Sequence, residues 1–203
     1  MLSFWNERYA ANEYAYGEAP NAFLKTQLAE FPFGNILFPA EGEGRNAVYA
    51  ASLGWEVHAF DQSEAGQKKA LQLAQKHGVE INYFVNTEAD LPYKAHQFDA
   101  MALIYAHFPG PLKSAIHQKL TPLLKPGGIV IFEAFSKKNL EYVAKNPSVG
   151  GPRDFETLFS IEEIQADFAD FEPLLLREEI VDLQEGLYHN GQGAVIRFVG
   201  RKR

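Results

Sequence analysis

A short segment rich in glycine and acidic residues follows the first apolar run of the chain. Its sequence is Ala40-Glu41-Gly42-Glu43-Gly44-Arg45-Asn46. Glycine lets the backbone bend sharply and lets a ligand approach the main chain closely, and the N–H groups that open the following helix then face a polar or anionic group. A Gly-x-Gly pattern alone is also compatible with a purely structural turn.

A carboxylate follows this turn at the spacing expected of a ribose-binding acid. Asp61 ends the second apolar run and lies 17 residues after Gly44. A carboxylate at the end of a second strand can accept hydrogen bonds from both ribose hydroxyls. The turn and the acid together fit either S-adenosylmethionine or a nicotinamide dinucleotide. No tyrosine is followed four positions later by lysine, so the pair typical of short-chain dehydrogenases is missing.

Two histidines are candidate general bases. His107 follows an apolar run that ends near residue 104, and His189 lies in a turn-rich segment beside Glu185. The alternatives are a cofactor contact or helix cap for His107, and a turn-stabilising hydrogen bond between Glu185 and His189. The other histidines have no metal-ligand spacing, so we predict no metal site.

The elements that position these residues alternate between strand and helix. From residue 35 to residue 135, the pattern predicts a parallel sheet covered on both faces. Strands are expected at 35–39, 55–60, 81–85, 98–104 and 129–135, and helices at 46–53, 63–77 and 111–124. After a helix near 161–168, strands at 174–183 and 193–200 are joined by the turn-rich segment 184–192, which favours an antiparallel pair at one edge. This predicts an α/β fold: a Rossmann-like three-layer sandwich with a seven-stranded, mostly parallel sheet and an antiparallel C-terminal strand.

Residues 1–34 form an aromatic-rich extension without a strand pattern of its own. We predict a helical lid over the carboxyl ends of the strands, where ligands bind in open α/β sheets. The alternative is a structural helix on the far face of the sheet. With residues 35–203 as the Rossmann-like core, the whole chain 1–203 is expected to form one domain.

Composition narrows the classes of partner. The 203 residues carry a net charge of −7, and the only basic run is Arg201-Lys202-Arg203. A nucleic-acid partner is therefore disfavoured. There is no apolar stretch of membrane-spanning length and no cysteine, so we expect a cytoplasmic protein with a small-molecule substrate and no membrane partner. No pattern in the sequence indicates an oligomeric state.

Several segments resemble class I S-adenosylmethionine-dependent methyltransferases. Residues 36–46 resemble the first motif of this family, and residues 55–61 the second motif with its ribose-binding acid. Residues 89–92 look like the adenine-side acidic loop, and residues 124–129 are similar to the turn before the fifth strand. The resemblance implies S-adenosylmethionine as the cofactor and methyl transfer as the activity. A nicotinamide-dependent oxidoreductase and a noncatalytic cofactor-binding protein are the alternatives.

A narrower resemblance is to small bacterial tellurite-resistance and thiopurine-type methyltransferases. It is carried by residues 5–9, 16–21, 150–152 and 185–191, and it implies an N-terminal segment folded over the cofactor. The chain departs from the family pattern at Phe38, where an acid is usual, at Ala40, where a glycine is usual, and at Glu41. Glu41 can reach the cofactor's ammonium group in place of the missing acid.

The resemblance and the residue pattern together define the expected site. The expected catalytic residues are His107 and His189. The expected substrate-binding residues are Trp5, Tyr9, Arg45 and Glu185. The expected cofactor-binding residues are Tyr16, Ala40, Glu41, Gly42, Glu43, Gly44, Asn46, Asp61, Gln62, Ala89, Asp90, Leu91, Tyr105 and Ala106.

Overall fold

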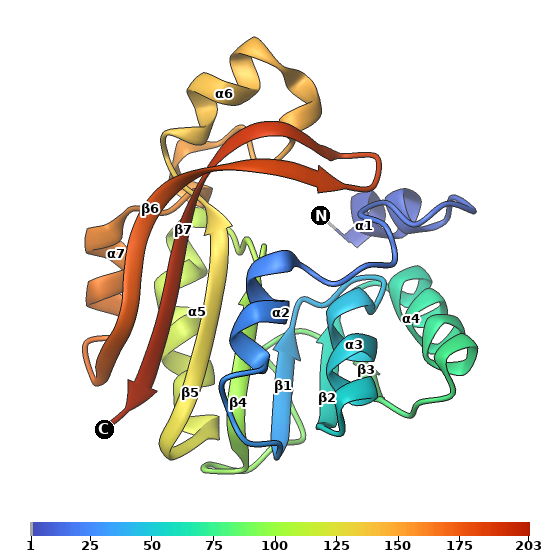
Figure 1. Ribbon diagram of the computed structural model, residues 1–203, viewed down its shortest axis with the longest axis vertical. Coiled ribbons are helices and arrows are strands. Elements are labelled where there is room, and N and C mark those ends of the chain that lie inside the picture. The colour runs from blue at the N-terminus through green and yellow to red at the C-terminus, as the bar shows by residue number, and fades with distance from the viewer. Residues whose placement is uncertain (1) are drawn as a thin grey trace.

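A mixed seven-stranded sheet forms the centre of the molecule (Figure 1). The computed structural model describes residues 2–203, apart from the side chains of residues 2 and 3. The strands are β1 (Asn35–Pro39), β2 (Glu56–Asp61), β3 (Asn82–Val85), β4 (Phe98–Ile104), β5 (Leu124–Phe135), β6 (Phe171–Glu185) and β7 (His189–Lys202). Their order is β3-β2-β1-β4-β5-β7-β6; β7 is antiparallel to both β5 and β6, and all other neighbouring strands are parallel. The predicted α/β sheet is confirmed.

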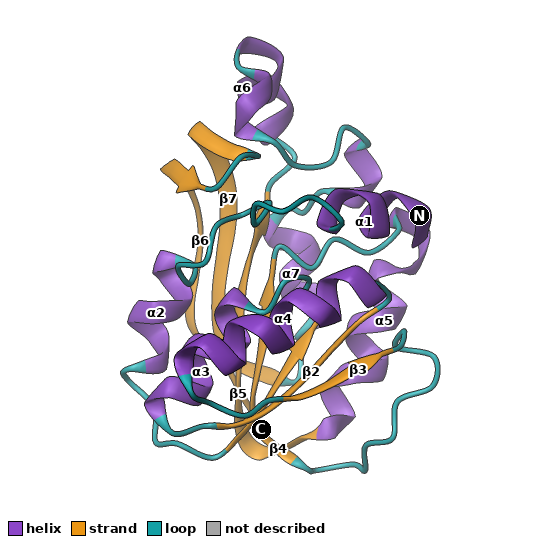
Figure 2. Ribbon diagram, turned by 90° about the vertical axis from the view of Figure 1, so that its right-hand side faces the viewer, coloured by secondary structure: helices purple, strands orange, loops and turns teal. Residues whose placement is uncertain are grey.

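Helices cover both faces of this sheet (Figure 2). They are α1 (Leu2–Tyr9), α2 (Ala22–Leu28), α3 (Arg45–Leu53), α4 (Glu64–His77), α5 (Lys113–Leu120), α6 (Asn139–Lys145) and α7 (Ile161–Asp167). Short 3-10 turns lie at Gly110–Leu112, Thr121–Leu123, Pro147–Val149 and Phe155–Thr157. Because side chains alternate along a strand, Ile36 and Phe38 of β1 pack with α2, α3 and α4, whereas Leu37 packs with α5 and α7. The structure is therefore a three-layer sandwich.

The helix ends follow their local sequence signals. The Ser63 hydroxyl accepts a hydrogen bond from the Gly66 N–H at 3.0 Å and so caps α4. Gly54 and Gly78 end α3 and α4 in the left-handed conformation, with φ of 106° and 66°. These caps fix where the polar loops between strands and helices begin.

Four elements differ from the sequence expectation. The predicted helix 111–124 is shorter because Pro111 and Pro122 lie in 3-10 turns on either side of α5. The predicted turn at 125–128 is part of β5. The predicted turn-rich segment 184–192 is mostly strand, because Gly186, with φ of 62°, allows a tight turn between β6 and β7. Helix α6 was not predicted.

The N-terminal segment divides into two parts. Helix α1 packs against α4, and the Asn6 carboxamide oxygen accepts from the Ser63 hydroxyl at 2.7 Å. The hairpin of β6 and β7 arches over the sheet towards α1 (Figure 1), and the Leu187 N–H donates to the Ala15 carbonyl at 2.8 Å. Helix α2 instead packs on one face of the sheet with the core. The predicted lid position thus applies to α1 and the following loop, and the structural alternative applies to α2.

Between residues 2 and 203, the structure contains no helix with the length and apolar character needed to cross a membrane.

Candidate functional site

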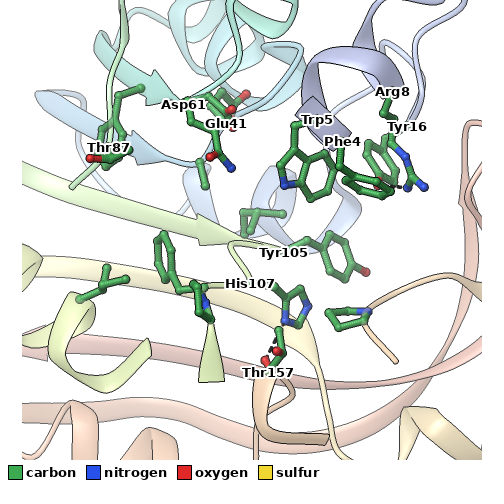
Figure 3. Close-up of a pocket in the computed structure, with 18 of the residues that line it drawn as sticks. Phe4, Trp5, Arg8, Tyr16, Glu41, Asp61, Thr87, Tyr105, His107 and Thr157 are labelled. Carbon is green, nitrogen blue, oxygen red and sulfur yellow. Dashed lines mark hydrogen bonds between the residues drawn. The ribbon is translucent and has the colours of Figure 1, made fainter. Parts of the chain in front are cut away.

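A cavity of about 490 Å³ lies where β1, β2 and β4 end (Figure 3). Helix α1 covers it, and the loop after β3, the loop between β4 and α5, and the end of β5 complete its wall. Its volume is in the range of about 300–1,000 Å³ typical of small-molecule sites. The carboxyl ends of parallel strands are the expected location for a ligand in this class of fold.

Asp61, the last residue of β2, lines this cavity. Its two carboxylate oxygens accept hydrogen bonds from the Gly42 N–H at 3.1 Å and from the Ser63 N–H at 2.9 Å. Burial raises the pKa of Asp61 to about 6, although these backbone hydrogen bonds act in the opposite direction. The main chain thus holds a desolvated carboxylate in a fixed position at the cavity wall.

Glu41 is a second carboxylate on the same wall. One of its oxygens accepts from the Asn46 N–H at 2.9 Å and the Ala47 N–H at 2.8 Å, the first free N–H groups of α3. Burial raises the pKa of Glu41 to about 7. The N–H groups at the start of α3, which were expected to face the ligand, are therefore bonded to Glu41. The carboxylate of Glu41 faces the cavity in their place.

The glycine turn itself packs away from the cavity. The Glu43 carboxylate accepts from the Ala15 N–H at 2.8 Å and from Lys69 Nζ at 2.7 Å. A Cβ on Gly44 would lie 2.5 Å from the Ala70 Cβ, and one on Gly42 would lie 2.6 Å from the Tyr9 hydroxyl. Gly42, Glu43 and Gly44, predicted to bind the cofactor, are not among the residues that line the cavity. Their space is needed to pack α3 on α4 and α1 on the turn.

The loop after β3 meets the cavity earlier than predicted. Asn86, Thr87 and Glu88 line it. Ala89 and Asp90 are exposed to solvent, and Leu91 packs against the main core. The residues directly after the strand, rather than the acidic segment, therefore reach the site. Asn86, Thr87 and Glu88 were not predicted; their place directly after the predicted strand 81–85 is the sequence signal that could have identified them.

The remaining predicted cofactor residues surround the two carboxylates, with one exception. Ala106 is buried outside the cavity lining, whereas its neighbour Tyr105 lies on the wall with φ of 51°. The other predicted residues that line the cavity are Tyr16, Ala40, Asn46 and Gln62.

His107 lines the cavity with both ring nitrogens hydrogen-bonded. The Phe135 N–H donates to Nε2 at 3.3 Å, so Nδ1 carries the proton and donates to the Thr157 carbonyl at 3.2 Å. Burial lowers the pKa of His107 to about 4. This arrangement argues against the predicted role of His107 as a general base, because its one lone pair is already bound to the backbone.

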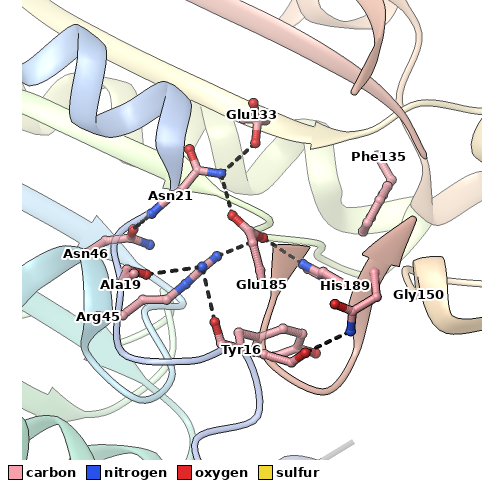
Figure 4. A network of polar contacts seen from close by, with 12 residues as sticks. Tyr16, Ala19, Asn21, Arg45, Asn46, Glu133, Phe135, Gly150, Glu185 and His189 are labelled. Carbon is pink, nitrogen blue, oxygen red and sulfur yellow. Dashed lines mark hydrogen bonds and ion pairs between the residues drawn. The ribbon is translucent and has the colours of Figure 1, made fainter. Parts of the chain in front are cut away.

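His189 has a different environment (Figure 4). Its Nδ1 lies 3.0 Å from a carboxylate oxygen of Glu185, and its ring packs between Tyr16 and Tyr105, with centroids 4.5 and 4.6 Å away. Burial lowers the pKa of His189, against the effect of its hydrogen bond to Glu185, and so favours the neutral ring. With the proton on Nδ1 facing Glu185, Nε2 keeps its lone pair. Among residues 2–203, no hydrogen-bond donor occupies that lone pair.

Arg45 and Glu185 belong to a buried network that joins distant parts of the chain (Figure 4). Arg45 pairs with Glu185 at 3.1 Å and donates to the carbonyls of Tyr16 and Ala19 at 3.3 and 3.4 Å. Glu185 also accepts from Asn21 at 3.1 Å. Its hydrogen bond to His189 and the charge of Arg45 lower the pKa of Glu185 to about 2, against the effect of burial. Glu185, predicted to bind the substrate, does not line the cavity; its carboxylate contacts Arg45 and His189, which do.

Aromatic side chains form the cover of the cavity. Trp5 and Tyr9 line it as predicted residues and stack with ring centroids 5.4 Å apart. Other lining residues were not predicted: Arg8, Gly151 and Pro152 lie inside segments that carry the family resemblance, and the rest come from separate segments with no common motif. These other lining residues are Phe4, Arg8, Phe60, Ile104, Phe108, Pro109, Leu112, Ile116, Phe135, Gly151, Pro152 and Thr157.

The charges of the wall fit S-adenosylmethionine, which carries an ammonium group, a sulfonium and a ribose diol. Neither Glu41 nor Asp61 has a Lys, Arg or His partner within 4.0 Å in the described part of the chain. Two desolvated carboxylates without a cation are stabilised by a cationic ligand with hydroxyl donors. Residues 2–203 contain no group of three or more His, Asp or Glu side chains arranged to hold a metal ion.

Comparison with known proteins agrees with this fit. A family described as a methyltransferase domain matches residues 36–128. This match supports a methyltransferase domain in that part of the chain. The methyltransferase match includes Glu41, Asp61 and His107, whereas the helix that covers the cavity and the hairpin with His189 lie outside it. None of the curated proteins matches the sequence.

Solved structures share the fold at low sequence identity. A protein studied in the conversion of a disulfide bond into a thioacetal group during echinomycin biosynthesis is 17% identical, with a TM-score of 0.79 over 100% of this chain and 92% of that one. TehB from Haemophilus influenzae is 16% identical, with a TM-score of 0.73 over 100% of this chain and 67% of TehB. Magnesium protoporphyrin IX methyltransferase from Synechocystis PCC 6803 with bound SAH is 17% identical, with a TM-score of 0.67 and coverages of 89% and 81%.

Proposed function

We propose that this chain transfers the methyl group of S-adenosylmethionine to a small-molecule acceptor. One observation carries the proposal: Glu41 and Asp61 face a cavity that continues beneath aromatic side chains of the N-terminal segment. The cofactor supplies an electrophilic methyl group, so the protein mainly has to orient the acceptor and exclude water. A cavity of about 490 Å³ under a cover suits a small acceptor better than a macromolecule.

Asp61 and Glu41 bind the cofactor in this proposal. Asp61 accepts hydrogen bonds from the ribose hydroxyls, and Glu41 faces the ammonium group. Their backbone hydrogen bonds at 2.8–3.1 Å hold both carboxylates in place before the ligand arrives. Such preorganisation lowers the entropy lost on binding.

His189 accepts the proton of the acceptor atom where that atom carries one. The proton moves to Nε2 while Nδ1–H remains bonded to Glu185, 3.0 Å away, whose negative charge stabilises the imidazolium formed. Arg45 holds Glu185 in the correct position through their 3.1 Å pair. An acceptor that is already anionic, such as a thiolate, does not need this base.

The tellurite-resistance and thiopurine-type group is the proposed subfamily. Its support is the sequence resemblance at residues 5–9 and 185–191 and the TM-score of 0.73 to TehB. The structure adds that these two segments contact each other, because Arg8 lies 4.1 Å from the ring centroid of Tyr188.

Ligand binding followed by turnover tests the proposal. Calorimetry with S-adenosylhomocysteine should give saturable binding to one site, and NAD and NADP should give none. An acceptor screen coupled to release of S-adenosylhomocysteine then distinguishes an enzyme from a noncatalytic binding protein. Stabilisation by NAD instead of S-adenosylhomocysteine would favour the oxidoreductase alternative.

A further inference from the structure

Two buried carboxylates of the cavity lie far from one of its two arginines. Glu41 and Asp61 lie at one end, and Arg8 lies at the other, with Trp5 between them in the view of Figure 3. Arg45, the other arginine of the wall, is neutralised by Glu185 at 3.1 Å. The cationic end of the cavity therefore depends on Arg8.

Arg8 is held by groups that leave most of its donors unused. Its Nη1 donates to the Tyr16 hydroxyl at 3.1 Å, and its guanidinium carbon lies 4.6 Å from the Phe4 centroid and 4.1 Å from the Tyr188 centroid. Within the described part of the chain no carboxylate lies within 4.0 Å of it. A guanidinium has five N–H donors in a planar fork that matches a carboxylate. The stacked rings fix the plane of this fork without neutralising its charge.

We propose that Arg8 binds an anionic group of the acceptor, and that the acceptor class is a small planar organic acid. This inference rests on the proposed function and adds the chemical class of its substrate. The carboxylate of the acid pairs with Arg8, and its ring lies against the aromatic side chains that line the cavity, among them Trp5 and Tyr105. Flat apolar rings gain dispersion and stacking energy in such surroundings.

The electrostatics around His189 agree with this arrangement. The charges of Arg45 and Arg8 add to burial in lowering the pKa of His189. Arg8 is therefore close enough to act on the residue proposed to accept the proton. An anion bound to Arg8 offsets its charge and makes His189 a stronger base when the acceptor is present.

Matched pairs of ligands test this inference on the full chain saturated with S-adenosylhomocysteine. Benzoate, 4-hydroxybenzoate and 2-naphthoate are each compared with the corresponding primary amide by calorimetry. At least one acid should bind about tenfold more tightly than its amide, because a charged bidentate pair is lost in the amide. Arg8→Gln should reduce this preference to about twofold or less, and Arg8→Lys should keep part of it. Arg201→Gln, a change at an exposed arginine, should keep all of it.

The remaining outcomes separate this inference from the proposed function. Failure of the wild-type chain to bind S-adenosylhomocysteine contradicts the proposed function itself. If the wild-type chain binds it and Arg8→Gln weakens that binding about tenfold or more, Arg8 contacts the cofactor's own carboxylate and the inference is wrong. It is also wrong if no acid binds better than its amide. If Arg8→Gln weakens the binding of acid and amide equally, Arg8 has a structural role in holding α1. That outcome also contradicts the inference.

Discussion

The two ends of the cavity are built in different ways. Glu41 and Asp61 bind the backbone of residues 42, 46, 47 and 63, so this end is assembled from two short segments. The opposite end depends on contacts such as Arg45 with Glu185, which are 140 residues apart, and Asn21 with Glu185, which are 164 apart. The first end is encoded by local sequence, and the second exists only when the whole chain has folded.

The two ends of the cavity also differ in proposed function: one binds the cofactor, and the other receives the acceptor. Local motifs position a group that every methyl transfer of this type shares, whereas the distant contacts shape the space for the acceptor. The two ends are thus expected to respond differently to substitution: one through cofactor affinity, the other through turnover and acceptor choice.

The largest expected effect is on turnover in His189→Gln. With a hydroxyl or amine acceptor, kcat should fall by about 100-fold or more because the proton acceptor is lost. Affinity for S-adenosylhomocysteine should stay within about twofold in this variant, since His189 lies at the opposite end from Asp61. In the wild type, protonation of His189 removes the base, so the rate should fall as pH drops through a pKa that burial places below the usual value of about 6.5.

His107→Gln is the matched control for this profile. Burial lowers the pKa of His107 to about 4, and the Phe135 N–H occupies its Nε2. The fall in rate at low pH should therefore remain in this variant. If the fall in rate at low pH disappears in His107→Gln and persists in His189→Gln, His107 rather than His189 is the base.

The next largest effect is on cofactor affinity in Asp61→Ala. Loss of the carboxylate leaves two ribose hydroxyls and the Gly42 and Ser63 N–H groups without their acceptor. The cost should be about 2–3 kcal/mol in binding of S-adenosylhomocysteine. Calorimetry on the folded variant measures it, with Asp182→Ala at an exposed position of β6 as the control. Equal affinities in the two variants would remove Asp61 from the cofactor site.

A smaller effect concerns pH and Glu41. Burial raises the pKa of Glu41 in the folded chain to about 7, from an ordinary value of 4.5. Between these values the folded state binds more protons than the unfolded state, so the unfolding free energy of the ligand-free protein should fall as pH rises, by an amount on the order of 3 kcal/mol. The ammonium group of S-adenosylhomocysteine favours the ionised form of Glu41, so affinity for this ligand should rise over the same range.

Glu41→Gln tests this coupling while keeping an oxygen to cap α3. Both pH dependences should become flatter in this variant, measured by thermal unfolding and calorimetry at several pH values. Asp61, with a pKa of about 6, should still contribute a smaller dependence. Unaltered slopes in Glu41→Gln would place the titrating group elsewhere.

The sequence predicts the strand–helix core well because its signals are local. Ser63 caps α4 at the predicted residue, and Gly54 and Gly78 end their helices as predicted. Asp61 lines the cavity because it lies at the carboxyl end of a parallel strand, where ligands bind in this class of fold. The element boundaries near residue 125 and in 184–192 were harder to predict. Residue types that usually form turns lie there inside β5 and inside the hairpin of β6 and β7.

The sequence does not show which polar atoms are already used inside the fold. Glu43 and Glu185 look like site residues, yet Lys69 binds the first, and Arg45 and His189 bind the second. His107 looks like a base until the Phe135 N–H occupies it. Each of these partners lies at least four positions away, and three lie more than twenty-five away. No motif encodes such a pairing, so only the folded structure distinguishes available groups from satisfied ones.

The smallest expected effect is a change in amide exchange within the N-terminal segment. Trp5, Arg8, Tyr9 and Tyr16 line the cavity, whereas α2 packs in the core of one sheet face. Bound S-adenosylhomocysteine should therefore slow exchange across residues 5–16, by about threefold to tenfold, because local opening of α1 must break contacts with the occupied site. Exchange in residues 22–28 should stay unchanged and serves as the internal control. Equal protection of both parts would mean that the ligand stabilises the whole domain, and no change before residue 17 would show that α1 does not close over the cofactor.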